Sequence, residues 1–410
     1  MQPDRFAAMR IKEFQFFIFG RLLFITGLRM MSTVLAWWIY EVTHDPFAIG
    51  LIGLAEVIPA VSLALYAGHI IDITDRSKIL RYSVMAFSFT IFLIFIISTS
   101  YFQNLFPENK WLPVLYGLIF ITGAIRAFSG NAFHAIIAQL VPFESLPNAI
   151  TFNSGTFLTA SITGHAMGGL LIAGMGIKNT LFISFILTVL ASFFLSGISA
   201  KLPGEIKKDI SAWQSVREGL AYVYKTKDLF AAMILDLFAV LFGGAVAMIP
   251  AFAKDVLNVG PTGFGWLNAA GDMGSMITVI GLALRPLKKN QGKTLLYVVA
   301  GFGLSIIVFG VSKSYLLSFI ALFLSGVLDG VSTIIRGTIA QVKTPNEIKG
   351  RVLSVNSIFI NSSNELGQFE SGLAAKMLGL VPSVIFGGSM TLLVVIVTWF
   401  KAPTLKKLEY

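Results

Sequence analysis

The sequence places charged and titratable side chains inside long apolar stretches. These residues are the cations Arg21, Arg29, Arg126 and Arg336, the acids Glu56, Asp236, Asp272, Asp329, Glu365 and Glu370, and the histidines His134 and His165. A charge inside a membrane helix costs about 2.5–3.5 kcal/mol on insertion scales, so each one needs a partner of opposite charge or a water-filled cavity. Cations and acids are comparable in number, which indicates pairing. The excess of acids indicates that some carboxyl groups take up protons.

Glu365 is the first candidate for proton or substrate contact. It lies in the stretch NSSNELGQFESG, where Asn361, Asn364, Glu365 and Gln368 recur at three- and four-residue spacing and so share one helix face. At 1.5 Å per residue, Glu365 lies about 20 Å along its apolar run, past the middle of a bilayer. The alternative is a structural carboxylate held by an arginine or an amide. Glu370 is about 140° further around the helix, so we expect a packing or gating contact there.

The elements that must position these residues are long apolar helices. The chain has 410 residues, of which 55% are hydrophobic and only 13% are charged. Runs of roughly 18 or more apolar residues recur throughout, and each is long enough to cross a bilayer as a helix. We predict an all-α membrane protein with twelve transmembrane helices, at residues 14–40, 46–71, 80–101, 112–140, 150–175, 179–199, 228–252, 263–284, 294–312, 315–340, 352–377 and 380–400.

The basic residues predict the orientation in the membrane. Most of them fall in one set of loops and helix ends, including Arg76, Lys78, Lys201, Lys207, Lys208, Lys288, Lys289, Lys349 and Arg351. The positive-inside rule then places both termini and the long central loop in the cytoplasm of a multi-pass protein of the bacterial inner membrane. The net charge of +10 therefore belongs to helix ends and does not indicate nucleic-acid binding.

The predicted spans and the long loop between the sixth and the seventh divide the chain into three parts. Residues 1–200 form an N-terminal six-helix bundle, and residues 228–410 form a C-terminal six-helix bundle. Residues 201–227 form a cytoplasmic linker. Within the linker, SAWQSVREGLAYVY carries an apolar stripe at helical spacing, and its first residue, Ser211, suits a helix cap. We expect an amphipathic helix on the inner membrane surface.

The two halves resemble each other. HAIIAQLVP, from His134, matches RGTIAQVKTP, from Arg336, and Gly164-His165 falls opposite Gly367-Gln368. Repeated halves with glycine-rich segments at matching positions are typical of secondary transporters. His134 and Arg336 lie near the cytoplasmic ends of their predicted helices, so we expect both at the membrane interface.

The repeat also relates the intramembrane charges. Arg126 and Asp329 occupy nearly equivalent positions and, more roughly, so do Arg21 and Asp236. One interpretation is that pairs form and break across a central cavity during transport. The other is that pairs within each half hold the bundle together. Arg29 either attracts an anionic substrate or extends to the outer interface.

Two further segments resemble motifs of the major facilitator superfamily. GHIIDITDRSK resembles the loop signature G-x-L-A-D-R-x-G-R-R/K, with Gly68, Asp72 and Arg76 in place and Lys78 one position late. The resemblance implies a conformational-switch loop whose acid caps a helix of the other half and whose basic residues join a charge relay. Ile73 stands where the family has an arginine.

The segment GHAMGGLL, with Gly164, His165, Gly168 and Gly169, resembles the exporters' antiporter motif G-P-x-x-G-G, with His165 in place of proline. His165 could titrate near neutral pH, or it could be a packing residue in a glycine-rich helix.

TPNEIKGRVLSVNSIFINSSNELGQFESGLAAKMLG and EVTHDPFAIGLIGL are similar to the enterobactin-exporter branch, a drug and siderophore efflux group. The resemblance implies proton-coupled antiport of a siderophore-like or amphipathic aromatic compound by alternating access. A multidrug or macrolide exporter of the same fold, or an importer, is the alternative.

Other function classes find little support in the sequence. It contains no cysteine, no Walker loop and no clustered histidines, so we expect no enzyme activity, no metal site and no cofactor. The expected partners are a small-molecule substrate, protons and the lipid bilayer, without nucleic acid, around a monomer.

Overall fold

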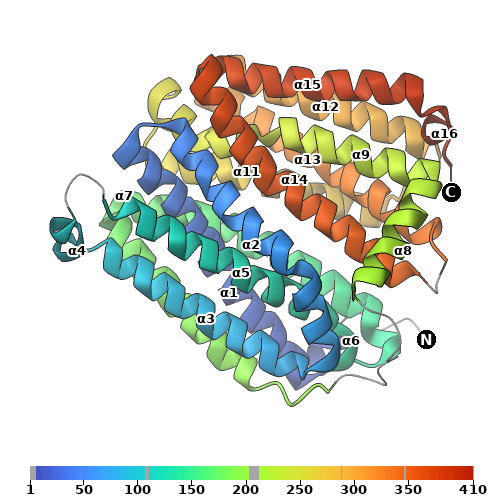
Figure 1. Ribbon diagram of the computed structural model, residues 1–410, viewed down its shortest axis with the longest axis horizontal. Helices are drawn as coiled ribbons and strands as arrows, with labels where there is room; N and C mark the ends of the chain where they lie inside the picture. The colour runs from blue at the N-terminus through green and yellow to red at the C-terminus, as the bar shows by residue number, and fades with distance from the viewer. Residues whose placement is uncertain (1–5, 107–109, 203–211, 288, 346–347, 410) are drawn as a thin grey trace. The chain divides into compact units, whose positions relative to one another are not determined.

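The computed structural model describes residues 6–106, 110–202, 212–287, 289–345 and 348–409, and every regular element within these ranges is a helix (Figure 1). The longer helices are α1 (Lys12–Thr43), α2 (Pro46–Ile73), α3 (Arg76–Ile97), α5 (Leu112–Ala135), α7 (Leu146–Ser196), α8 (Ala212–Lys225), α9 (Lys227–Phe242), α11 (Pro261–Leu284), α12 (Gln291–Val311), α13 (Tyr315–Val342), α14 (Lys349–Leu378) and α15 (Leu380–Lys401). Short helices are α4 (Ser100–Leu105), α6 (Ile137–Leu140), α10 (Ile249–Ala251) and α16 (Pro403–Lys406).

These helices confirm the predicted twelve-helix membrane fold. Ten segments of the described chain are long and apolar enough to cross a bilayer. One of them is 54 residues long and contains α7, in which Gly176 has a φ of +79° and separates the two spans predicted there. The remaining span is α14, which has 30 residues but is too polar to count among the ten. Its polarity comes from the stretch around Glu365.

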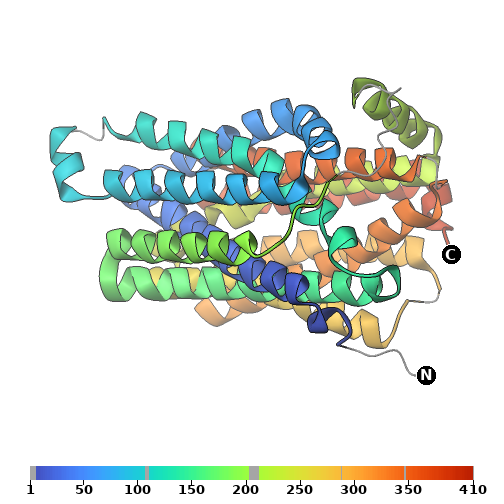
Figure 2. The same ribbon diagram turned by 90° about the horizontal axis from the view of Figure 1, so that it is seen from below.

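The chain divides into two compact units. The first comprises Met1–Trp38 and Ile58–Asp209, and the second comprises Ile39–Val57 and Ile210–Tyr410. In the first unit, α3 packs against α5 and α7, and Figures 1 and 2 both show α3 beside α5. In the second unit, α11 packs on α13, and α12 packs on both α13 and α15.

Glycine permits the closest of these helix contacts. A side chain on Gly326 of α13 would overlap the backbone of Gly271 on α11, and one on Gly274 would overlap the carbonyl of Phe323. Backbones approach this closely only where side chains are absent, which is the usual way in which membrane helices gain packing contacts.

The predicted linker helix is present as α8. It packs against α14, where Glu218 forms an ion pair with Arg351 and the backbone of Arg351 leaves no room for a side chain on Gly219. The Tyr222 hydroxyl donates to the Lys343 carbonyl at 2.5 Å. Ser211, the predicted helix cap, lies outside the described residues. These contacts fix α8 to the second unit.

Candidate functional site

A buried arginine shared by two carboxylates lies between α9 and α13. Arg336 is 8% exposed and forms an ion pair with Asp236 of α9. Its Nη2 lies 3.7 Å from Oδ1 of Asp329, two helical turns earlier on α13. Its Nε and Nη2 also donate to the hydroxyls of Ser332 and Thr333, each at 3.1 Å. One guanidinium thus holds two acids from two helices.

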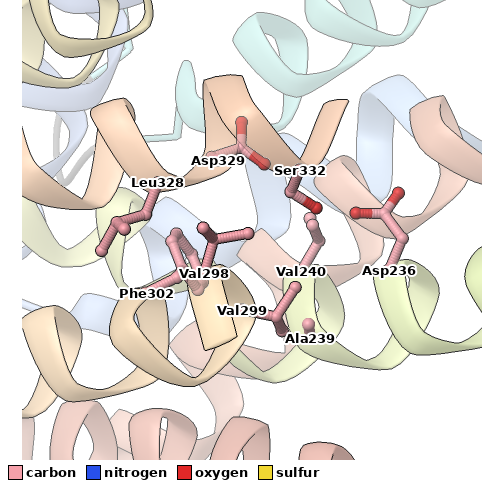
Figure 3. Close-up of a pocket in the computed structure, with 9 residues that line it drawn as sticks. All are labelled: Asp236, Ala239, Val240, Val298, Val299, Phe302, Leu328, Asp329 and Ser332. Carbon is pink, nitrogen blue, oxygen red and sulfur yellow. The ribbon is translucent and has the colours of Figure 1, made fainter. Parts of the chain in front are cut away.

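A cavity of about 10 Å³ adjoins this cluster, lined by Asp236, Asp329 and Ser332 and by apolar residues of α9, α12 and α13, including Phe302 (Figure 3). This is about the room that one water molecule needs, and the three polar groups could hydrogen-bond to it. Figure 3 shows Ser332 between the two carboxyl groups. The two acids differ in access, since the side chain of Asp329 is 44% exposed and that of Asp236 is 8% exposed.

This arrangement bears on the predicted pairs. Asp236 and Asp329 both pair with Arg336 of the same unit, as in the interpretation that places the pairs within each half. The guanidinium of Arg336 is buried between α9 and α13, and the interfacial position expected for it stays a prediction. The seven-residue separation of Asp329 and Arg336, which puts both on one side of a helix, could have revealed the pair from sequence.

In the first unit, arginines gather around aromatic rings. Arg21 of α1 is 4% exposed, and its guanidinium carbon lies 5.0 Å from the ring centre of Phe133 and 5.9 Å from that of Phe157. Arg29 lies 5.5 Å from the same Phe157 ring, and its Nε donates to the Ser161 hydroxyl at 3.2 Å. Among the described residues no carboxylate pairs with Arg21, and its Nε and Nη1 are buried without an acceptor.

The glycine-rich motif GHAMGGLL lies in α7, where this helix meets α1. A side chain on Gly164 would lie 2.7 Å from the Arg29 Cβ, and one on Gly168 would lie 3.1 Å from the Thr33 Cβ. Nδ1 of His165 lies 2.8 Å from the Thr33 hydroxyl. Gly169 is also buried. These contacts make the motif a close-packed contact between two helices.

Glu365 lies in α14 and is 7% exposed, whereas Asn361 and Asn364 are exposed and Gln368 is half-buried. The backbone carbonyl of Glu365 touches Gly53 of α2, which leaves no room there for a side chain. Glu365 is thus buried, whereas Asn361 and Asn364, which share its helical spacing, are exposed. Arg126 of α5 is half-buried.

In the predicted switch loop, the residue that makes the contacts is Asp75. Its Oδ1 accepts from the Ser77 backbone at 3.0 Å and from the Lys201 backbone at 2.9 Å, so it both caps α3 and holds the start of the linker. Burial raises the pKa of this carboxyl, but the hydrogen bonds from Lys201 and Ser77 outweigh it, and the pKa falls below its ordinary value. Asp75 stands where the signature G-x-L-A-D-R-x-G-R-R/K has its second glycine, so the resemblance gave it no role. An aspartate two residues before a serine at a helix start is the signal that could have found it.

The other members of the loop make fewer described contacts. Arg76 donates from Nη1 to the Ala135 carbonyl at 3.3 Å, and its backbone nitrogen donates to the Lys201 carbonyl at 3.1 Å. Lys78 is exposed, and Gly68 has open space around it. The side chain of Asp72 lies outside the described part of the chain.

A family model described as transmembrane secretion effector matches residues 4–409. The chain belongs to this family of the major facilitator superfamily. It is 21% identical to the multidrug efflux pump Tap of Mycolicibacterium fortuitum over 96% of both chains. It is 22% identical to the Staphyloferrin A transporter of Staphylococcus aureus over 96% of this chain and 98% of that one.

A solved structure of the nucleoside transporter NupG has the same fold, with a TM-score of 0.77 at 11% identity over 95% of this chain and 99% of that one. The family member described here is therefore a multi-pass membrane transporter of small molecules with two pseudo-symmetric six-helix halves.

Proposed function

We propose that this transporter is a secondary active exporter that exchanges protons for a small organic compound. It resides in the bacterial inner membrane as a monomer, with both termini in the cytoplasm. Residues 1–200 and 228–410 form the two six-helix bundles that alternate access, and residues 201–227 link them. Support for export comes from the similarity to a multidrug efflux pump and from the glycine-rich segment GHAMGGLL of α7.

The cluster of Asp236, Arg336 and Asp329 is the observation that carries proton coupling. Two carboxylates and one guanidinium have a formal charge of −1, which is costly in a site of low dielectric constant. One proton makes the cluster neutral without breaking the ion pair between Asp236 and Arg336. A site that is stable both with and without one proton suits a carrier that loads protons on one side of the membrane and releases them on the other.

Asp329 is the acid that takes the proton. It is the more exposed of the two carboxylates, and its oxygen lies at 3.7 Å from Arg336, beyond hydrogen-bonding distance. Asp236 stays ionised as the counter-ion of Arg336. Protonation of Asp329 removes its charge and weakens its electrostatic attraction to Arg336. This change in a buried cluster shifts the equilibrium of the bundle toward its other conformation.

Glu365 is a second candidate for the coupling acid. It is buried in α14 at the contact with Gly53 of α2, so a change in its charge would act on the packing of those two helices. In vesicles, Glu365→Gln should slow transport less than Asp329→Asn and should leave the response to a pH gradient intact. Loss of that response in Glu365→Gln alone would transfer the coupling role to Glu365.

The substrate is a siderophore-like or amphipathic aromatic compound. The similarity of the α14 sequence to siderophore exporters supports the first class, and the likeness to a multidrug pump supports a broader range of compounds as the second candidate. Culture medium and cell extract are compared between strains with and without the gene. The exported compound is the one that, in the strain without the gene, is depleted from the medium and retained in the cells. A compound depleted from the cells would instead indicate import.

The identified compound then tests coupling in inside-out vesicles. With an acidic lumen, the wild-type protein should accumulate the compound, and a protonophore should abolish accumulation. Accumulation that ignores the pH gradient but follows a sodium gradient would contradict proton coupling.

A further inference from the structure

We propose that Arg21 and Arg29, which both lie against the ring of Phe157, bind the carboxylate of an aromatic or apolar organic anion. This site deepens the proposed function by naming the charge of the exported compound, and it rests on that function. The second unit holds Arg336 between two acids, whereas the first unit holds two arginines on one phenylalanine ring.

Arg21 is the first argument for an anion. Its guanidinium is 4% exposed, and two of its nitrogens are buried without an acceptor within the described structure. A buried cation without a counter-charge costs several kcal/mol, and the rings of Phe133 and Phe157 return only part of that cost as cation–π attraction. A carboxylate would supply both the charge and the acceptor oxygens, because guanidinium donors match carboxylate geometry.

A second argument is the register of α1 and α7. Arg29 contacts Ser161 and Thr33 contacts His165, and both pairs are 132 residues apart. Arg21 and Asn153 have the same separation, so they lie at the same level of the two helices. The Asn153 oxygen is also buried without a partner in the described residues, although the side chain is only 5% exposed. Donor groups of Arg21 and an acceptor oxygen of Asn153 are therefore unsatisfied at one level. The carboxylate of a ligand would accept from Arg21, and the Asn153 oxygen would accept only from a donor group of that ligand.

The aromatic rings identify the rest of the ligand. Phe157 lies 5.9 Å from the guanidinium carbon of Arg21 and 5.5 Å from that of Arg29, so each cation faces the same ring. Arg21 and Arg29 are eight residues apart, about 12 Å along α1. An anion placed between them would rest its apolar body on Phe157. A compound with one carboxylate attached to an aromatic system has this combination of groups.

Binding of a matched pair of probes to the purified full chain in a neutral maltoside detergent tests this site. The probes are 1-naphthoate and 1-naphthamide, which differ in charge but hardly in shape, and their Kd values come from thermal-shift titrations. We expect the wild-type protein to bind naphthoate about tenfold tighter than naphthamide. The free energy of one hydrogen bond to a charged group corresponds to about this ratio of Kd values.

Arg21→Gln and Arg29→Gln should each remove the preference for the anion and leave naphthamide binding unchanged. Lys178→Gln is the matched control, because it removes one positive charge from an exposed position of the same unit, and it should keep the preference. If Arg21→Gln does not fold, Arg21→Lys and Arg29→Gln decide the outcome. Equal Kd values for the two probes in the wild-type protein, or an unchanged preference in Arg29→Gln, would overturn the proposal.

The same titration separates this inference from the proposed function. Binding in detergent involves no gradient, so Asp329→Asn should keep the preference for naphthoate even though it loses proton-driven transport. A chain that prefers the anion but does not respond to a pH gradient would leave the anion site standing and remove proton coupling.

Discussion

The two units place buried arginines in opposite surroundings. In the second unit, Arg336 lies between Asp236 and Asp329, with two hydroxyls as additional acceptors. In the first unit, Arg21 lies beside two phenylalanine rings, and no described acid pairs with it. One cluster is compensated internally and has one carboxylate in excess, and the other is a cation without compensation. We propose that the second half accepts a proton at its cluster, whereas the first half binds an anion at its arginines.

The largest expected effect is the loss of the compensated arginine. Arg336→Gln leaves two carboxylates facing each other without their counter-ion, and we expect a loss of about 3–5 kcal/mol in stability. A thermal unfolding series in detergent measures it, with the exposed Arg285→Gln of the same unit as the control. A melting temperature equal to that of the control would mean that the Arg336 cluster contributes no stability.

Removal of the uncompensated arginine should have the opposite sign. Arg21→Gln removes the desolvation cost of a buried cation and loses two cation–π contacts, so we expect a gain of about 1–2 kcal/mol. The same unfolding assay compares it directly with Arg336→Gln. A destabilisation as large as that of Arg336→Gln would show that Arg21 has a compensating partner, and the contrast between the units would be lost.

Close helix contacts at glycine should contribute equally to stability in the two units. The difference between the units would then lie in their buried charges alone. An added Cβ would lie 2.7 Å from Arg29 at Gly164 and 2.8 Å from the Val240 carbonyl at Gly367. We expect Gly164→Ala and Gly367→Ala each to cost about 1–3 kcal/mol, because the helices must separate. Gly174→Ala, with open space around it, is the control and should be neutral or slightly stabilising. Unequal losses of stability in Gly164→Ala and Gly367→Ala would show that the helix contacts at these two glycines differ in their packing.

The smallest effect concerns Asp75, a charge outside both buried clusters. Asp75→Asn should lower stability by up to about 1 kcal/mol at neutral pH, because the amide keeps a capping oxygen but loses the charge that strengthens the hydrogen bonds from Ser77 and Lys201. The pKa of the folded state is lowered, so the stabilisation is complete above the ordinary aspartate pKa of about 3.9 and disappears as the pH falls through the lower folded value. Melting temperatures of both proteins from neutral to acidic pH should converge at the acidic end. A constant difference over the whole range would contradict a role for the ionised carboxylate.

The sequence predicted the membrane helices because length and apolarity alone decide whether a segment can span a bilayer. α14 is too polar to meet a test of length and apolarity, but the apolar residues on both sides of its polar stretch still predicted a span at 352–377. The repeat placed Asp236, Asp329 and Arg21 among the candidates. It did not predict that one arginine serves both acids, because partners on α9 and α13 come together only through helix rotation and packing.

The amide-rich stripe of α14 shows a second limit. Helical spacing puts Asn361, Asn364 and Glu365 on one side, yet only the acid is buried. Spacing determines direction around a helix, whereas the neighbouring helix determines which part of that side is covered. The contact of Asp75 with Lys201 was missed for a related reason, since the two residues lie far apart along the chain.

Substrate exchange by Asp329→Asn tests the central claim most directly. In inside-out vesicles that contain the exported compound, labelled compound outside should exchange with unlabelled compound inside without any gradient, at a rate near that of the wild type. The same vesicles with an acidic lumen should fail to accumulate the compound, because the site can no longer take up a proton. Gradient-driven accumulation at the wild-type level in Asp329→Asn would contradict the assignment of the proton to the cluster around Arg336.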